Sequence, residues 1–187
     1  AGVTHLAIPN LGNYSVALAA AVQSLGIEAW ATTCTTPESM RLGIEASPES
    51  TCLPFKAHIG HFLEAANAGV EYALMVNSIG TCRLRYYRKL EEQILAERGV
   101  KMRVFGLGYD GFKPPVVRFF DPKIVPFLKS VANAVQKMRA VDELETAAWR
   151  TRAREVRPGE TTRVLNECLK ALWECKSAKE SRAFLSL

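Results

Sequence analysis

Four short apolar runs alternate with helical patterns along the first part of the chain. The third run is almost wholly apolar, which is typical of a strand covered on both faces. The fourth alternates between apolar and polar residues, which favours a position nearer the edge of a sheet. Short connections between such strands and helices predict an α/β fold with a parallel, doubly wound, Rossmann-like sheet of about four strands. The runs are Thr4–Ile8, Ile27–Thr32, Val70–Val76 and Lys101–Leu107.

Between these runs, apolar residues recur at the helical period and glycines follow as stops. Pro37 predicts the start of a short helix that ends at Gly43, followed by a loop over Ile44–Pro54. The expected longer helices are Tyr14–Leu25, Lys56–Ala68 and Arg83–Arg98.

The pattern changes after Gly108, where no further strand is expected. We predict a boundary near residue 110, with an α/β domain over residues 1–110 and a helical extension over residues 111–187. The extension is expected to hold a helix to about Ala140 and then the helices Val141–Val156 and Thr161–Lys176.

Charge, apolar run length and cysteine count argue against three classes of protein: nucleic-acid-binding, membrane-spanning or secreted, and disulfide-stabilised. The net charge of +5 is too diffuse to predict nucleic-acid binding. No apolar run approaches the length of a membrane span and no secretory signal opens the sequence, so we expect a cytoplasmic protein. Five widely spaced cysteines are an odd number, which favours free, buried or metal-bound thiols over a disulfide framework.

Three cysteines come from three separate loops of the predicted sheet. Cys34 follows the second strand, Cys52 precedes a helix, and Cys82 follows the third strand at a helix start. Strand-to-helix loops of a doubly wound sheet share one rim, so we expect the three thiols to meet at one mouth. A helix N-terminus favours the thiolate, the species that binds metal. Soft thiolates select iron–sulfur clusters, zinc or copper(I).

Basic side chains accompany these cysteines. Lys56, Arg83 and Arg85 would further favour the thiolate form and would offset the negative charge of a cluster. Two other interpretations stay open. A structural zinc site could add His58 or His61 to the three thiols. Alternatively, the cysteines are small buried core residues, since free cysteine is among the most buried residue types. This interpretation is favoured by the lack of a CxxC pair, which would indicate a metal site.

The segments Cys52-Leu53-Pro54-Phe55-Lys56 and Gly80-Thr81-Cys82-Arg83-Leu84-Arg85-Tyr86-Tyr87 resemble a known family. The sequence is similar to the CoA protein activase proteins, relatives of the subunits of 2-hydroxyacyl-CoA dehydratases and of benzoyl-CoA reductase. IPNLGNYSVAL, LGIEASPESTCLPFK and AVDELETAAWRTRAREVRPGETTRVL carry the same resemblance, which therefore spans most of the chain. One departure is Ile79, at a position where the family often has a further cysteine.

The resemblance implies a Rossmann-like part of a longer protein whose cysteines hold a [4Fe–4S] cluster, with Cys52 and Cys82 as ligands. It also implies partnership with an ATP-dependent activator, or with a second subunit or domain, in low-potential electron transfer or radical acyl-CoA chemistry. The chain would then be a component of a dehydratase-like or reductase-like system. Cys34 could fill the place of the missing cysteine. The alternative is a metal-free or zinc-binding α/β interaction domain without catalytic activity.

Overall fold

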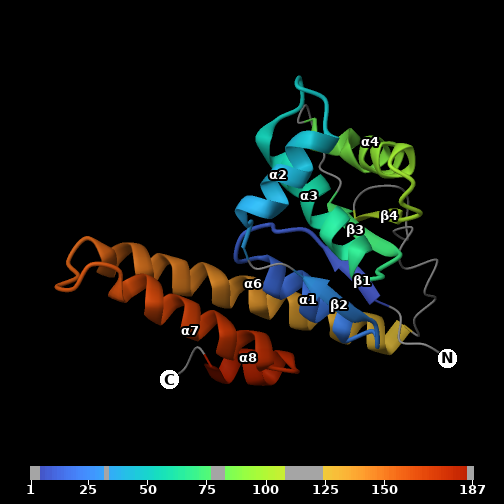
Figure 1. Cartoon of the computed structure of the whole chain (residues 1–187). Coiled ribbons are helices and arrows are strands. Elements are labelled where there is room, and N and C mark those ends of the chain that lie inside the picture. The colour runs from blue at the N-terminus through green and yellow to red at the C-terminus, as the bar shows by residue number, and fades with distance from the viewer. Residues whose placement is uncertain (1–4, 32–33, 77–82, 108–123, 185–187) are drawn as a thin grey trace. The chain divides into compact units, whose positions relative to one another are not determined.

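The structure is a computed structural model of the 187-residue chain and describes residues 5–31, 34–76, 83–107 and 124–184. It divides into two compact units: Ala1–Ser15 with Ile27–Pro122, and Val16–Gly26 with Lys123–Leu187. The predicted boundary near residue 110 lies outside the described residues. The first unit holds the sheet and the second is helical (Figure 1).

The sheet has four parallel strands in the order β2-β1-β3-β4, which confirms the predicted fold class. The central strands carry continuous apolar runs because both of their faces are buried. Ala73 and Met75 point to one face of β3 and Leu74 to the other, and all three are at most 2% exposed. β4 lies at an edge, as its alternating sequence predicts. The strands are β1 (His5–Ile8), β2 (Glu28–Ala31), β3 (Tyr72–Val76) and β4 (Arg103–Leu107).

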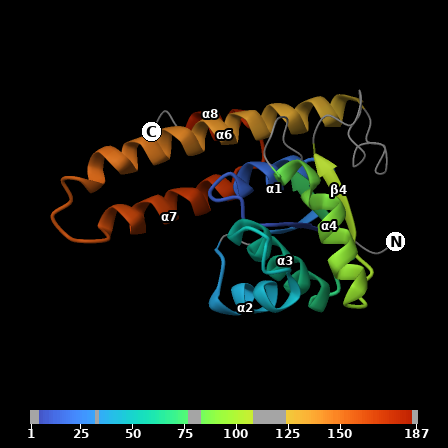
Figure 2. The ribbon, with the colours of Figure 1, turned by 90° about the horizontal axis from the view of Figure 1, so that it is seen from above.

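Helices α3 (Leu53–Asn67) and α4 (Leu84–Glu97) cover one face of the sheet (Figure 2). Their apolar stripes form one buried cluster with side chains of β1, β3 and β4. Burying such side chains contributes on the order of 2 kcal/mol each, so this cluster is the main stabilising element of the first unit. Its largest fully buried members are Phe55, Ile59, Phe62, Met75 and Leu95.

Helix α2 (Pro37–Ala46) packs against α3 more closely than side chains would allow. A Cβ atom on Gly43 would lie 1.8 Å from the carbonyl oxygen of Lys56, and one on Gly60 would lie 1.8 Å from that of Ser39. The prediction that this helix ends at Gly43 is wrong, because Gly43 is the contact point of two helices and α2 continues to Ala46. The predicted loop correspondingly begins three residues later.

The second unit contains α1 (Ser15–Gln23) beyond its first residue, α6 (Ile124–Arg152), α7 (Glu160–Glu174) and α8 (Ala178–Phe184). The prediction of two helices meeting at Ala140 is wrong. α6 runs through this point because the sequence around it has neither glycine nor proline to interrupt the hydrogen-bond ladder. The short helix α8 was not predicted. None of the helices in the described ranges combines the length and apolar character needed to span a bilayer.

The first half of α6 has its polar and apolar faces reversed relative to an ordinary surface helix. Ser130, Asn133 and Lys137 are at most 4% exposed. An apolar stripe on the opposite side is between 40 and 59% exposed. The apolar stripe consists of Val125, Leu128, Val131, Val135 and Met138.

Candidate functional site

Cys52 occupies the N-cap position of α3, directly before Leu53 and Pro54. Proline is suited to the first turn of a helix because its missing N–H would have no partner there. Cys52 is exposed at the surface and its thiol is free. Its Sγ contacts the hydroxyl group of Tyr87, in the first turn of α4. The beginnings of α3 and α4 therefore lie next to each other.

Tyr87 is itself held firmly. Its side chain is 7% exposed, and its ring meets that of Phe55 edge to face with centroids 4.7 Å apart. Aromatic pairs of this geometry add about 1 kcal/mol beyond the area they bury. The position of the Tyr87 hydroxyl beside Cys52 is thus fixed by core packing between the two helices.

The charges around Cys52 favour an anion at this end of the helices. The N-terminus of α3 carries a partial positive charge. Lys56 lies half-buried one turn further along α3, and Arg83 is exposed at the N-cap of α4. Arg85 belongs to α4, but its side chain is outside the described part of the structure. The predicted basic residues therefore lie on the two helices that approach Cys52.

Cys34 is positioned differently. α2 and α3 run antiparallel, because Ser39 near the start of α2 lies against Gly60 while Gly43 lies against Lys56, nearer the start of α3. Cys34 precedes the start of α2 and Cys52 precedes the start of α3, so they are at opposite ends of the helix pair. The ten residues of α2 span about 15 Å along its axis. The structure does not bring these two thiols together.

Cys82 lies outside the described residues, so its place as a third thiol stays a prediction. Within the ranges that are described, no three side chains of histidine, cysteine, aspartate or glutamate gather closely enough to hold one metal ion. At the start of α3 the described residues thus supply one exposed thiol, Cys52, while the exposed thiol of Cys34 lies at the other end of the helix pair. They do not supply a complete set of cluster ligands.

A buried cluster of titratable groups lies further along the α3–α4 interface. His58, His61 and Glu91 are each at most 4% exposed. His58 Nδ1 and Glu91 Oε1 are 3.5 Å apart, without the alignment of a hydrogen bond. Both Glu91 oxygens and His61 Nε2 have no hydrogen-bond partner among the described residues. Such groups cost free energy when they are buried, so this cluster is a strained point of the core.

Burial determines how these groups titrate. It raises the pKa of Glu91 above its ordinary value, while the neighbouring His58 opposes the shift. Burial lowers the pKa of His61 to about 4, and the charge of His58 contributes in the same direction. At neutral pH His61 is therefore an uncharged imidazole.

The neutral His61 connects α3 to the carboxyl end of β1. The backbone N–H of Asn10 donates a hydrogen bond to His61 Nδ1 over 3.2 Å, so the ring proton is on Nε2. The side-chain amide of Asn10 in turn donates to Thr35 Oγ1, just beyond β2. His61 thus fixes the loop after β1, and we interpret it as a structural residue rather than a zinc ligand.

Sequence reasoning missed two residues of this region, Tyr87 as the contact of Cys52 and Glu91 as the buried acid. A signal was available for Glu91. It lies four residues after Tyr87, on the apolar face of α4, where an acidic side chain is out of place. Its partner could not be inferred, because His58 is on another helix.

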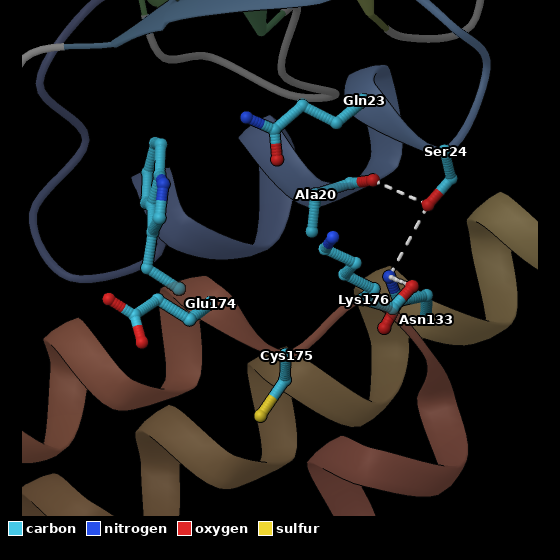
Figure 3. Close-up of a pocket in the computed structure, with 8 residues that line it drawn as sticks. Ala20, Gln23, Ser24, Asn133, Glu174, Cys175 and Lys176 are labelled. Carbon is cyan, nitrogen blue, oxygen red and sulfur yellow. Dashed lines mark hydrogen bonds between the residues drawn. The ribbon is translucent and has the colours of Figure 1, made fainter.

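The helical unit contains a hollow of about 430 Å³ between α1, α6 and the end of α7 (Figure 3). The Asn133 amide donates to Ser24 Oγ and to the Lys176 carbonyl oxygen, and Lys137 Nζ donates to the Trp173 carbonyl oxygen. Carbonyl groups at the end of a helix lack partners within that helix. The buried polar side chains of α6 therefore supply donors at the ends of α1 and α7, which is a structural role.

Comparisons of the sequence with protein-family models and with curated proteins, and of the fold with solved structures, found no match. The structure by itself defines the class of protein: an α/β domain with a four-stranded parallel sheet, together with a helical unit.

Proposed function

We propose that the chain is an iron–sulfur protein in which Cys52 and Cys82 are ligands of a [4Fe–4S] cluster. It would act in low-potential electron transfer or radical acyl-CoA chemistry, together with an ATP-dependent activator or a second subunit, as the resemblance to dehydratase components implies. Lys56, Arg83 and Arg85 would offset the charge of the cluster or contact acyl-CoA phosphates.

The contact between Cys52 Sγ and the Tyr87 hydroxyl is the observation that supports this proposal most. It joins the start of α3 to the first turn of α4, the helix that follows Cys82 directly in the sequence. Cys34 is not included, because α2 separates it from Cys52. The remaining ligands of the cluster would come from another chain, another domain or a bound small molecule.

Anaerobic purification followed by iron and sulfide analysis tests the proposal. We expect a brown protein with about four iron atoms per cluster, and loss of that iron in both Cys52→Ala and Cys82→Ala. Cys168→Ala is the matched control, because this cysteine is on α7 in the other unit. A colourless protein without iron, even after reconstitution with iron and sulfide, would refute the cluster.

The second candidate is a metal-free or zinc-binding interaction domain. The observation that favours it is the exposed apolar stripe of α6, since large exposed apolar patches mark interaction sites. Zinc in stoichiometric amount, removed by Cys52→Ala, would identify the zinc-binding form. Absence of both metals, with Cys52 reactive toward alkylation, would identify the metal-free form.

A further inference from the structure

The turn that joins α6 to α7 carries a concentration of arginine. Residues 149–163 contain five arginines and two glutamates, and they contain no lysine. A guanidinium group can bind a phosphate through two parallel hydrogen bonds, which an ammonium group cannot do. The composition of the turn therefore favours a phosphate-bearing ligand. The five arginines are Arg150, Arg152, Arg154, Arg157 and Arg163.

Three of these arginines are uncompensated. Arg150, Arg154 and Arg157 are exposed, and in the described ranges none of them has a carboxylate within 4.0 Å. Arg163 differs because it forms ion pairs with two glutamates of its own helix. Arg152 donates a hydrogen bond to a threonine hydroxyl of α7 over 3.2 Å and so joins the two helices. The turn thus presents three positive charges to solvent.

A carboxylate holds the turn in shape without cancelling these charges. Glu155 accepts hydrogen bonds from the backbone N–H groups of Gly159 over 2.9 Å and of Thr161 over 3.1 Å. Both N–H groups lie at the start of α7, where the helix end carries a partial positive charge. The charge of Glu155 is therefore offset by that helix end, and the two bonds close the turn around Val156.

Apolar side chains accompany the arginines at this end of the hairpin formed by α6 and α7 (Figure 2). Val156 is 95% exposed, the highest value among the large apolar side chains of the described residues, and Trp149 near the end of α6 is 65% exposed. Val156 has no aromatic face on which a nucleic-acid base could stack. A lipid bilayer, in contrast, offers an apolar phase next to a layer of phosphates, and tryptophan is enriched at that boundary. The combination favours a bilayer surface over a nucleic acid.

We propose that the turn between α6 and α7 binds the surface of membranes that contain anionic phospholipids. Val156 enters the boundary between the headgroups and the acyl chains, and the three exposed arginines contact lipid phosphates. Trp149 is three residues before the last residue of α6. With the α6 axis along the membrane normal, this separation is a rise of about 5 Å, which places Trp149 within the headgroup layer. Binding of this kind is peripheral and needs no membrane-spanning helix.

The expected affinity is modest. Each arginine near an anionic membrane surface raises binding about fivefold, so three contribute about a hundredfold. Insertion of Val156 adds about tenfold, because a valine side chain at the boundary is buried only in part. The contribution of the arginines depends on salt, because the Debye length decreases from about 10 Å at 0.1 M to about 3 Å at 1 M. We therefore expect reversible binding that high salt strongly weakens.

Co-sedimentation of the full chain with lipid vesicles tests the proposal. We expect binding to vesicles of phosphatidylcholine with about 30% phosphatidylserine, and little binding to phosphatidylcholine alone. The double variant Arg154→Glu with Arg157→Glu should weaken binding at least about fiftyfold, because it reverses two charges at the membrane surface. Arg139→Glu is the matched control, since it makes the same change at an exposed position of α6. It lies about 20 Å before the end of the helix, beyond the Debye length, and should change binding less than about twofold.

Two measurements distinguish a bilayer from another polyanion. Val156→Leu adds one methylene and should strengthen vesicle binding about fourfold, while leaving any binding to a duplex RNA or to polyglutamate unchanged. The fluorescence of Trp149 should shift to shorter wavelength on vesicles, and Trp149→Phe should remove that shift. Circular dichroism of each variant checks that the helices remain folded. The proposal is overturned by a chain that does not bind the anionic vesicles, by binding that the double variant retains, or by binding to duplex RNA or polyglutamate alone.

Discussion

The contact between α2 and α3 gives the sharpest prediction about stability. Gly60→Ala would place a methyl group 1.8 Å from the Ser39 carbonyl oxygen, whereas contacts under 3.0 Å essentially never occur. The three nearest atoms all belong to the Ser39 backbone, so no side chain can move aside. The two helices must therefore separate by more than an ångström.

One favourable and two unfavourable contributions set the change in the free energy of unfolding. Alanine is a better helix former than glycine by about 1 kcal/mol, which favours the variant. Overpacking against a fixed backbone costs about 1–3 kcal/mol or more. Separation also lengthens the half-buried bonds from Ser39 Oγ to the Glu64 carboxylate, now 3.0 and 3.1 Å, at a cost of about 1 kcal/mol. We expect a net destabilisation of about 2–3 kcal/mol, a large part of the stability of a typical domain.

Urea unfolding followed by far-ultraviolet circular dichroism measures this change. Ala57→Gly on the same helix gives the propensity effect alone, and it should destabilise by about 1 kcal/mol. The double variant Gly43→Ala with Gly60→Ala should cost less than the sum of the single changes, because one separation relieves both contacts. A Gly60→Ala chain as stable as the wild type, or more stable, would refute the close contact.

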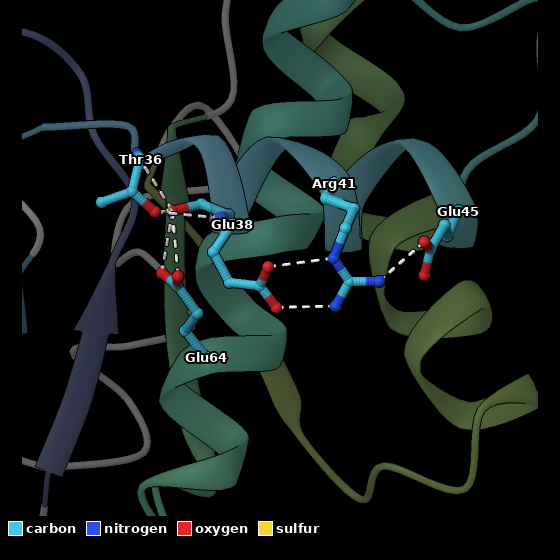
Figure 4. A network of polar contacts seen from close by, with 6 residues as sticks. Thr36, Glu38, Arg41, Glu45 and Glu64 are labelled. Carbon is cyan, nitrogen blue, oxygen red and sulfur yellow. Dashed lines mark hydrogen bonds and ion pairs between the residues drawn. The ribbon is translucent and has the colours of Figure 1, made fainter.

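Three further predictions concern polar groups of the first unit. The pKa of His61 in the folded chain, about 4, is below its ordinary value of 6.5. Its contribution to the free energy of unfolding is therefore complete above about pH 6.5 and falls as the pH decreases toward 4, by at most about 3 kcal/mol. In His61→Gln, urea titrations across this range should no longer show this pH dependence. The raised pKa of Glu91 has the opposite sign: its contribution is complete below 4.5 and is lost as pH rises, so Glu91→Gln should be more stable than wild type at about pH 8 but not at about pH 4. Ser39→Ala in α2 removes the bonds that Ser39 Oγ makes with the Thr36 N–H and with the Glu64 carboxylate (Thr36 and Glu64 are labelled in Figure 4), and should cost about 1–2 kcal/mol in thermal unfolding. Arg41→Ala, which removes only exposed ion pairs of the same helix, should leave stability unchanged.

The local pattern of apolar and polar residues was enough to predict most of the helices and strands. The continuous apolar run before Asn77 predicts the buried central strand β3, and the alternating run before Gly108 predicts the edge strand β4. Glycines at positive φ mark chain reversals after helices, as at Gly69 and Gly99. Gly43 shows where local pattern fails. Its lack of a side chain serves a contact with α3, and nothing in its own neighbourhood distinguishes that from a helix stop.

The candidate site, too, was predicted from the sequence only in part. Sequence alone indicated that Cys52 begins a helix and that basic residues accompany it, because capping and charge are local properties. The separation of Cys34 from Cys52 depends on the direction in which α2 runs along α3, and the pairing of His58 with Glu91 depends on which faces of two helices meet. These are properties of packing between distant segments. Periodicity along the chain fixes which side of a helix is apolar, but only the tertiary structure decides what that side faces, and on α6 it leaves the apolar side exposed.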